Sequence, residues 1–137
     1  MLWNHTIPRR EHADADGRIT TVTIVAGAGG GVAPPAPPPA SWASEPGSDV
    51  AIWTIHMAPG ARWTLPAAAS GVNRNLYLFR GDGAKVDGTP VDVGTGVKLR
   101  PTEAVALENG ATASEWLLLQ GRPIGEPVVQ YGPFVMN

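Results

Sequence analysis

Short apolar runs separated by glycine and proline turns are the feature that most restricts the fold of this chain. The runs are rich in β-branched and aromatic residues and recur roughly every 8–12 residues, as strands of β-sandwiches and barrels do. No segment has the apolar stripe of an amphipathic helix. The pattern therefore predicts an all-β sandwich or barrel. We expect strands at 18–26, 50–57, 61–65, 75–80, 85–86, 90–93, 97–100, 104–108 and 114–120.

Composition narrows the class of protein. The chain has 137 residues, 43% of them hydrophobic, and a formal net charge of −2, which suits one domain with its own core. Lys and Arg are scattered, so direct nucleic-acid binding is not expected. No apolar stretch approaches the ~20 residues of a membrane span, and the N-terminus lacks a signal-peptide pattern. Because the chain has no cysteine, a reducing compartment fits, and we expect a cytoplasmic protein with no membrane partner.

The chain divides into a polar leader at 1–17 and a single domain at 18–137. Within the domain, residues 30–40 form a proline-rich segment, which favours an extended ribbon because proline cannot donate ladder hydrogen bonds. Residues 121–137 form an apolar tail rich in proline and glycine. Such a tail must pack along its own domain or along a neighbour.

Motifs for cofactor and metal chemistry are absent or incomplete. The glycines of 27–31 follow a strand, but Val32 replaces the last glycine of a dinucleotide loop and no helix follows. Asp14-Ala15-Asp16-Gly17 resembles part of a calcium loop, yet its remaining ligand positions lack carboxylates, so we interpret it as a solvated turn. The histidines (His5, His12 and His56) are not grouped as metal ligands are. We therefore expect no catalytic, cofactor-binding or metal-binding residue.

Aromatic side chains are the remaining candidates for a site. They are Trp53, Trp63, Tyr77, Phe79 and Trp116, and all fall on expected strands. We expect them to belong first to the core. Because small barrels can also enclose a cavity, the same five are candidate barrel-lining residues for ligand contact.

The C-terminal residues carry a family resemblance. Gly-Glu-Pro at 125–127 followed by Gln-Tyr-Gly-Pro-Phe-Val-Met-Asn at 130–137 is long and specific. Asp16-Gly17-Arg18, Pro59-Gly60-Ala61 and the strand 76–79 agree with it. Together they resemble the C-terminal domain of the pirin family, whose members are bicupins with two β-barrels in one chain. The resemblance implies a cupin-type double-stranded β-helix, that is, a jelly-roll barrel or sandwich.

The resemblance also implies where a cofactor would lie. In pirins the iron is held in the N-terminal barrel by three His and one Glu, and that half is not found here. The positions that correspond to cupin metal ligands fall near Pro66, Ala68, Arg74 and Ala106. None of them is a carboxylate or an imidazole, and Arg74 would put a fixed positive charge where a cation would bind. No cofactor is therefore expected in this chain.

Three functions follow from these expectations. The first is a metal-free cupin module for dimerisation or protein interaction, with a homodimer or a pirin N-terminal barrel as partner. Its candidate interface residues lie in the tail: Val128, Val129, Tyr131, Phe134 and Val135. The second is the C-terminal half of an iron-dependent quercetin 2,3-dioxygenase whose metal lies in another barrel, so that this chain alone is not catalytic. The third is a metal-independent barrel that binds a flavonol-like molecule.

Overall fold

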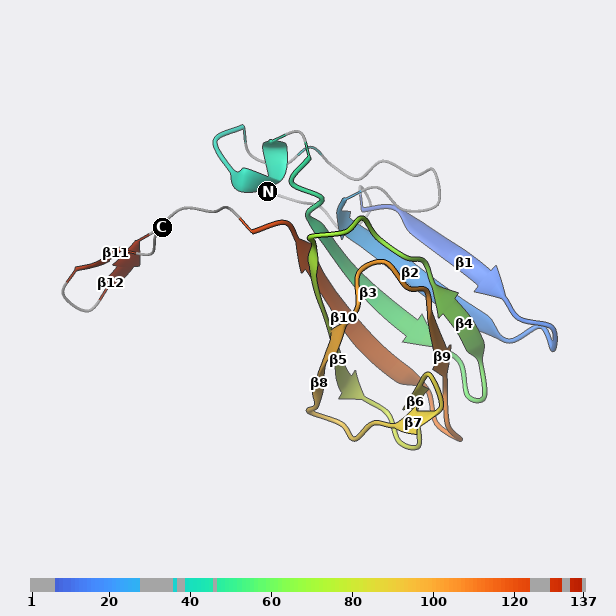
Figure 1. The fold of residues 1–137 in the computed structure, drawn as a ribbon. Coiled ribbons are helices and arrows are strands. Elements are labelled where there is room, and N and C mark those ends of the chain that lie inside the picture. The colour runs from blue at the N-terminus through green and yellow to red at the C-terminus, as the bar shows by residue number, and fades with distance from the viewer. Residues whose placement is uncertain are drawn as a thin grey trace.

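Two antiparallel sheets lie against each other in the computed structural model (Figure 1). The structure describes residues 7–27, 36, 39–45, 47–123, 129–131 and 134–136. The larger sheet has six strands in the order β1-β2-β3-β10-β5-β8, and the smaller has four in the order β4-β9-β6-β7. This arrangement confirms the all-β fold predicted from the turn-punctuated sequence.

The strand bounds follow the sequence pattern closely. The larger sheet contains β1 (Arg9–Ala13), β2 (Ile19–Ala26), β3 (Ala51–Met57), β5 (Asn73–Arg80), β8 (Gly96–Leu99) and β10 (Ser114–Gly121). The smaller contains β4 (Arg62–Leu65), β6 (Lys85–Val86), β7 (Thr89–Pro90) and β9 (Val105–Glu108). In the tail, β11 (Val129–Tyr131) and β12 (Phe134–Met136) pair with each other as a separate hairpin. The helix in the described ranges is one 3₁₀ turn at Trp42–Ser44.

The first strand lies where the sequence predicts a leader. Residues 9–13 pair with 19–23 of β2 along their whole length, so the sheet begins inside 1–17. Asp14 closes the turn between these strands: its Oδ1 accepts the backbone N–H groups of Asp16 and Arg18, each at 2.9 Å. Its Oδ2 accepts the backbone N–H of Arg62 at 3.1 Å, which ties the turn to β4. The solvated turn predicted for 14–17 is therefore present. Both carboxylate oxygens of Asp14 accept backbone hydrogen bonds.

Alternation along the strands places the core between the sheets. On β3, Ala51, Trp53, Ile55 and Met57 are buried, and the residues between them face outward. On β10 the same rule buries Ser114, Trp116 and Leu118. These side chains meet Leu65, Leu107 and other apolar groups of the smaller sheet in one cluster. The period of two is the geometry of a pleated strand with one face on the core.

The end of β10 anchors the segment that follows the proline-rich stretch. Trp42 donates its indole Nε1–H to the backbone oxygen of Arg122 over 2.8 Å. The Arg122 guanidinium in turn donates to the backbone oxygens of Gly47 and Ser70 and pairs with Asp49. Most of the 30–40 ribbon lies outside the described residues. In the described part of the chain, no helix is long and apolar enough to cross a membrane.

Candidate functional site

The five strand aromatics separate into inner and outer groups. Trp116 is completely buried, and Trp53 is 8% exposed. Trp63 is half-buried and packs against the core cluster. Tyr77 and Phe79 are 39% and 53% exposed, so the expectation that they belong to the core is wrong. The reason is strand parity: on β5 the even-numbered residues Arg74, Leu76 and Leu78 face inward.

Trp53 and Trp63 share a small pocket at the edge where β1 and β2 approach β4. The pocket has a volume of about 90 Å³, and its other lining residues are Arg10, His12, Val22, Ile24 and Pro66. The imidazole of His12 lies over the indole of Trp63, with ring centroids 5.3 Å apart and planes tilted by 31°. Burial, followed by the positive charge of Arg10, lowers the pKa of His12 from its ordinary value of 6.5.

Sequence reasoning missed Arg10 and His12 as lining residues because both fall in the expected leader. The signal that could have identified them is their spacing, because residues two apart on a strand share a face. A flavonol does not fit this pocket as it stands. Drug-sized ligands occupy clefts of about 300–1,000 Å³, so the space between the two tryptophans holds a small group only.

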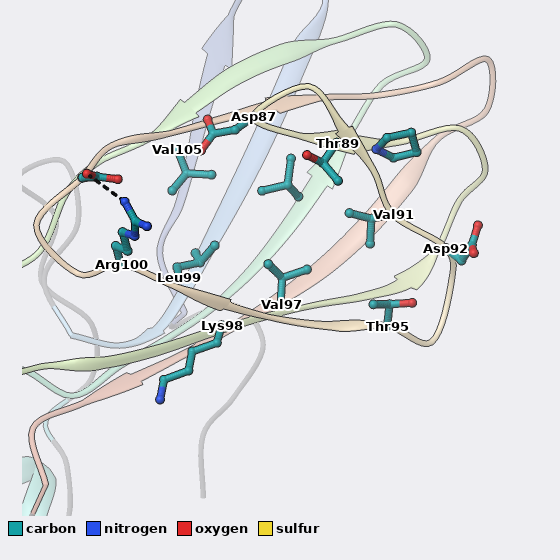
Figure 2. A pocket seen from close by; sticks show the side chains of 13 residues that line it. Asp87, Thr89, Val91, Asp92, Thr95, Val97, Lys98, Leu99, Arg100 and Val105 are labelled. Carbon is teal, nitrogen blue, oxygen red and sulfur yellow. Dashed lines mark ion pairs between the residues drawn. The ribbon is translucent and has the colours of Figure 1, made fainter.

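A larger pocket opens at the opposite edge of the sandwich, between β8 and the β6–β7 hairpin (Figure 2). Its volume is about 560 Å³. Figure 2 shows Val91, Val97, Leu99 and Val105 pointing toward one another at its floor, whereas Lys98 points away. The rim is polar and carries Asp87, Thr89, Asp92 and Thr95.

Three of the charged residues of this larger pocket make structural contacts: Asp87, Arg100 and Glu103. Asp87 Oδ1 accepts the backbone N–H of Ala106 at 2.8 Å, and the Asp87 N–H donates to the Ala106 oxygen at the same distance. Arg100 and Glu103 form an exposed ion pair of 3.7 Å. No aromatic side chain lines this pocket within the described ranges. An apolar floor with a polar rim suits binding of an apolar group.

Apolar side chains also cover part of the outer face of the larger sheet. Phe79 and Tyr77 are two residues apart on the outer face of β5, Tyr77 lies beside Leu117 of β10, and Leu119 of β10 and Ile52 of β3 continue the row. Leu117 is opposite Tyr77, and Leu119 is opposite Ile52. We call these five residues the outer strip. The described elements place no second layer over this face in Figure 1.

Comparison with known proteins places this fold in a family. The family model for the pirin C-terminal cupin domain matches residues 52–137. The chain belongs to the pirin family. The pirin resemblance seen in the C-terminal residues is thereby confirmed, and so is the cupin-type fold.

Similar proteins are known from plants and bacteria. A "Pirin-like protein" of Solanum lycopersicum is 41% identical over 84 residues, covering 59% of this chain and 28% of the relative. A Pseudomonas aeruginosa relative, whose name assigns it provisionally to the quercetin 2,3-dioxygenases, is 32% identical over 93 residues, covering 67% of this chain and 32% of its own length. The chain thus spans about three tenths of the curated relatives that it matches.

Among solved structures, a quercetin 2,3-dioxygenase from Acinetobacter baumannii superposes with a TM-score of 0.73. The match covers 99% of this chain and 43% of that chain, at 23% sequence identity. At this identity the likeness shows the fold alone. Together with the family match, it confirms the cupin-type all-β fold.

The positions that correspond to cupin metal ligands do not fit a metal ion. Pro66 and Ala106 are exposed, Ala68 is half-buried, and Arg74 is buried. These residues bring no imidazole or carboxylate together, and a guanidinium repels a cation. His56 is exposed on the outer face of β3, and His12 lies in the small pocket. Across the described residues, no three His, Cys, Asp or Glu side chains group as metal ligands do.

The expected interface of the tail remains a prediction. Val128 lies outside the described residues. Val129, Tyr131, Phe134 and Val135 lie on the β11–β12 hairpin, of which the structure describes the backbone pairing only.

Proposed function

We propose that this chain is a metal-free, non-catalytic cupin module that acts by associating with a second β-barrel through the outer strip. The observation that carries the proposal is the exposure of Tyr77 and Phe79, at 39% and 53%, on the outer face of the larger sheet. Contiguous apolar surface of this kind marks association sites more often than isolated exposed residues do. Aromatic side chains are also enriched at the energetic centres of interfaces.

The chemistry of the strip favours another barrel as its partner. Its residues lie on three neighbouring strands and present a flat, apolar, sheet-like surface, which suits another sheet face packed about 10 Å away. The family relatives extend well beyond the part that this chain matches. For the isolated chain, the second barrel is a second copy, and the product is a homodimer.

Sedimentation equilibrium of the purified chain tests this proposal. We expect a dimer at micromolar concentration and a shift to monomer in Phe79→Glu, with dimerisation weakened about tenfold or more. Thr64→Glu is the control, because Thr64 is exposed on β4, in the other sheet. A wild-type monomer throughout the micromolar range contradicts the proposal, as does equal weakening by both variants.

A second candidate rests on the names of the relatives. This chain would then be the C-terminal half of an iron-dependent quercetin 2,3-dioxygenase, with its metal in a partner barrel and association as its own contribution. Quercetin consumption by the chain alone and by the chain mixed with a metal-bearing pirin barrel tests this. Activity only in the mixture, reduced by Phe79→Glu, supports it.

A third candidate, binding of a flavonol-like molecule without metal, is favoured by the 560 Å³ pocket beside β8. That volume lies in the range of small-molecule sites. Isothermal titration with quercetin tests it, and Val97→Asp should abolish saturable binding because it places a charge on the apolar floor. Unchanged binding in this variant would contradict this candidate.

A further inference from the structure

Arg74 is a buried cation that forms no ion pair among the described residues. It lies on the inner face of β5, in register with Leu99 of β8 and Gln120 of β10, and is 1% exposed. Its Nε and Nη1 atoms are buried and have no hydrogen-bond partner among the described residues. We propose that Arg74 forms an internal site for a small carboxylate anion of about the size of formate or acetate.

No acidic side chain of the described interior neutralises this charge. The buried polar side chains in those ranges are Thr20, Ser48, Ser114 and Arg74 itself, and the first three are uncharged hydroxyl groups. The arginines that do form ion pairs lie at or near the surface: Arg18 with Asp16, Arg80 with Glu115, Arg100 with Glu103 and Arg122 with Asp49. Arg74 therefore differs from these arginines in both burial and pairing.

A buried guanidinium such as that of Arg74 requires a hydrogen-bond acceptor. Transfer of an ion into a low-dielectric interior is costly unless it is paired and hydrogen-bonded. Burial lowers the pKa of Arg74 from its ordinary value, but guanidinium groups stay protonated in proteins at neutral pH. The charge thus persists, and an anion that enters relieves the cost while satisfying donors that are otherwise unpaired.

The shape of the guanidinium selects the kind of anion. Its planar fork offers two parallel N–H groups to the two oxygens of a carboxylate, which is a better match than a spherical ion makes. Arg74 is 1% exposed, and Leu76 and Leu99, its neighbours on the inner face, are buried, so the anion must be small. This inference concerns the interior of the sandwich and does not depend on association through the outer strip.

Thermal unfolding of the full chain, followed by tryptophan fluorescence, tests the site. Sodium formate or acetate replaces sodium gluconate, whose anion is too large to enter, at pH 7 and constant ionic strength. We expect the wild-type Tm to rise by roughly 10 °C when the small carboxylate is about 100-fold above its Kd. Arg74→Met, which keeps an unbranched side chain without charge, should lose this dependence. Arg80→Met, on the same strand but exposed, should keep it.

A second measurement uses the wild type alone, so the test does not depend on folding of the Arg74 variant. Transverse relaxation of ¹³C-labelled acetate should accelerate in the presence of the protein, and excess formate should reverse the effect. Equal Tm shifts in the wild type and Arg74→Met would overturn the proposal. So would stabilisation by chloride without stabilisation by either carboxylate, or the absence of both the Tm shift and the relaxation effect.

Discussion

The indole Nε1–H of Trp116 donates to the hydroxyl Oγ of Ser114 over 3.0 Å, and both side chains are completely buried. The two residues are neighbours on the inner face of β10, the central strand between β3 and β5. The hydroxyl thus satisfies the one polar atom of the largest fully buried side chain. Trp116 is accordingly a core residue whose orientation is set by its own strand, and it is not free to donate to a ligand.

Replacing this hydroxyl should destabilise the fold. In Ser114→Ala the indole N–H is left buried without an acceptor, and we expect the free energy of unfolding to fall by about 1–3 kcal/mol. Urea denaturation followed by tryptophan fluorescence measures the change. Ser70→Ala, in an exposed loop, is the control. A loss no larger than that of the control would show that the indole finds another acceptor.

Arg122 should hold the Trp42–Asp49 segment against the end of β10. Its guanidinium donates to Gly47 and Ser70 at 2.9 and 3.2 Å and pairs with Asp49 at 2.8 Å. Arg122→Lys cannot reproduce this three-way contact, and because the side chain is 39% exposed we expect a loss of only about 1–2 kcal/mol.

The more specific result expected for Arg122→Lys is faster proteolysis within 42–49, because the segment loses its anchor while the sheets remain folded. Limited proteolysis with mass spectrometry reads out the cleavage sites. Arg100→Lys, which alters a looser exposed ion pair of 3.7 Å, is the control. Cleavage at unchanged rates in 42–49 would mean that Trp42 alone retains the segment.

Gly96 provides space for the ring of Tyr77 on the outer face. A Cβ at Gly96 would lie 2.7 Å from Tyr77 Cε1 and 3.0 Å from Cδ1, so the ring must move in Gly96→Ala. We expect a loss of about 1 kcal/mol in the free energy of unfolding. In a Tyr77→Ser background the same glycine substitution should cost less, since the clash is gone. A double-mutant cycle with no coupling energy would contradict this contact.

His12 should make stability depend on pH between about 5 and 7. Burial, with Arg10 beside it, lowers the pKa of His12 below 6.5, so in this range the unfolded chain binds the proton and the folded chain does not. Stability from this group is therefore complete above the unfolded pKa and is lost as pH falls toward the folded pKa. The groups that face the imidazole are Arg10 of β1 and Trp63 of β4.

The measurement is the free energy of unfolding of the wild type and His12→Gln from pH 8 to 5. The difference between the two should change with pH, with the wild type losing stability faster on acidification. His56→Gln removes an exposed imidazole and serves as the control. A pH-independent difference between wild type and His12→Gln would show that His12 titrates alike in the folded and unfolded chain.

The limits of sequence reasoning are visible in particular residues. Alternating apolar runs predict β2, β3 and β10 within one residue of their observed bounds, because a half-buried strand must place every second side chain on the core. β1 is missed because Arg-Arg-Glu-His-Ala carries the charges typical of a protected edge strand and has no apolar alternation. The small pocket is missed with it, since Arg10 and His12 come from that strand.

The sequence by itself determined the fold class, most of the strands between residues 18 and 121, the pirin family and the unusual charge at position 74. Each of these properties follows from the local sequence pattern or from motif residues. Only the tertiary structure decided that Tyr77 and Phe79 face outward and that Trp53 and Trp63 share one pocket. It also decided that Arg74 is buried, with its Nε and Nη1 lacking a hydrogen-bond partner among the described residues. Strand pattern specifies which residues share a face, whereas burial and pairing depend on which elements pack against that face, and these come from distant parts of the chain.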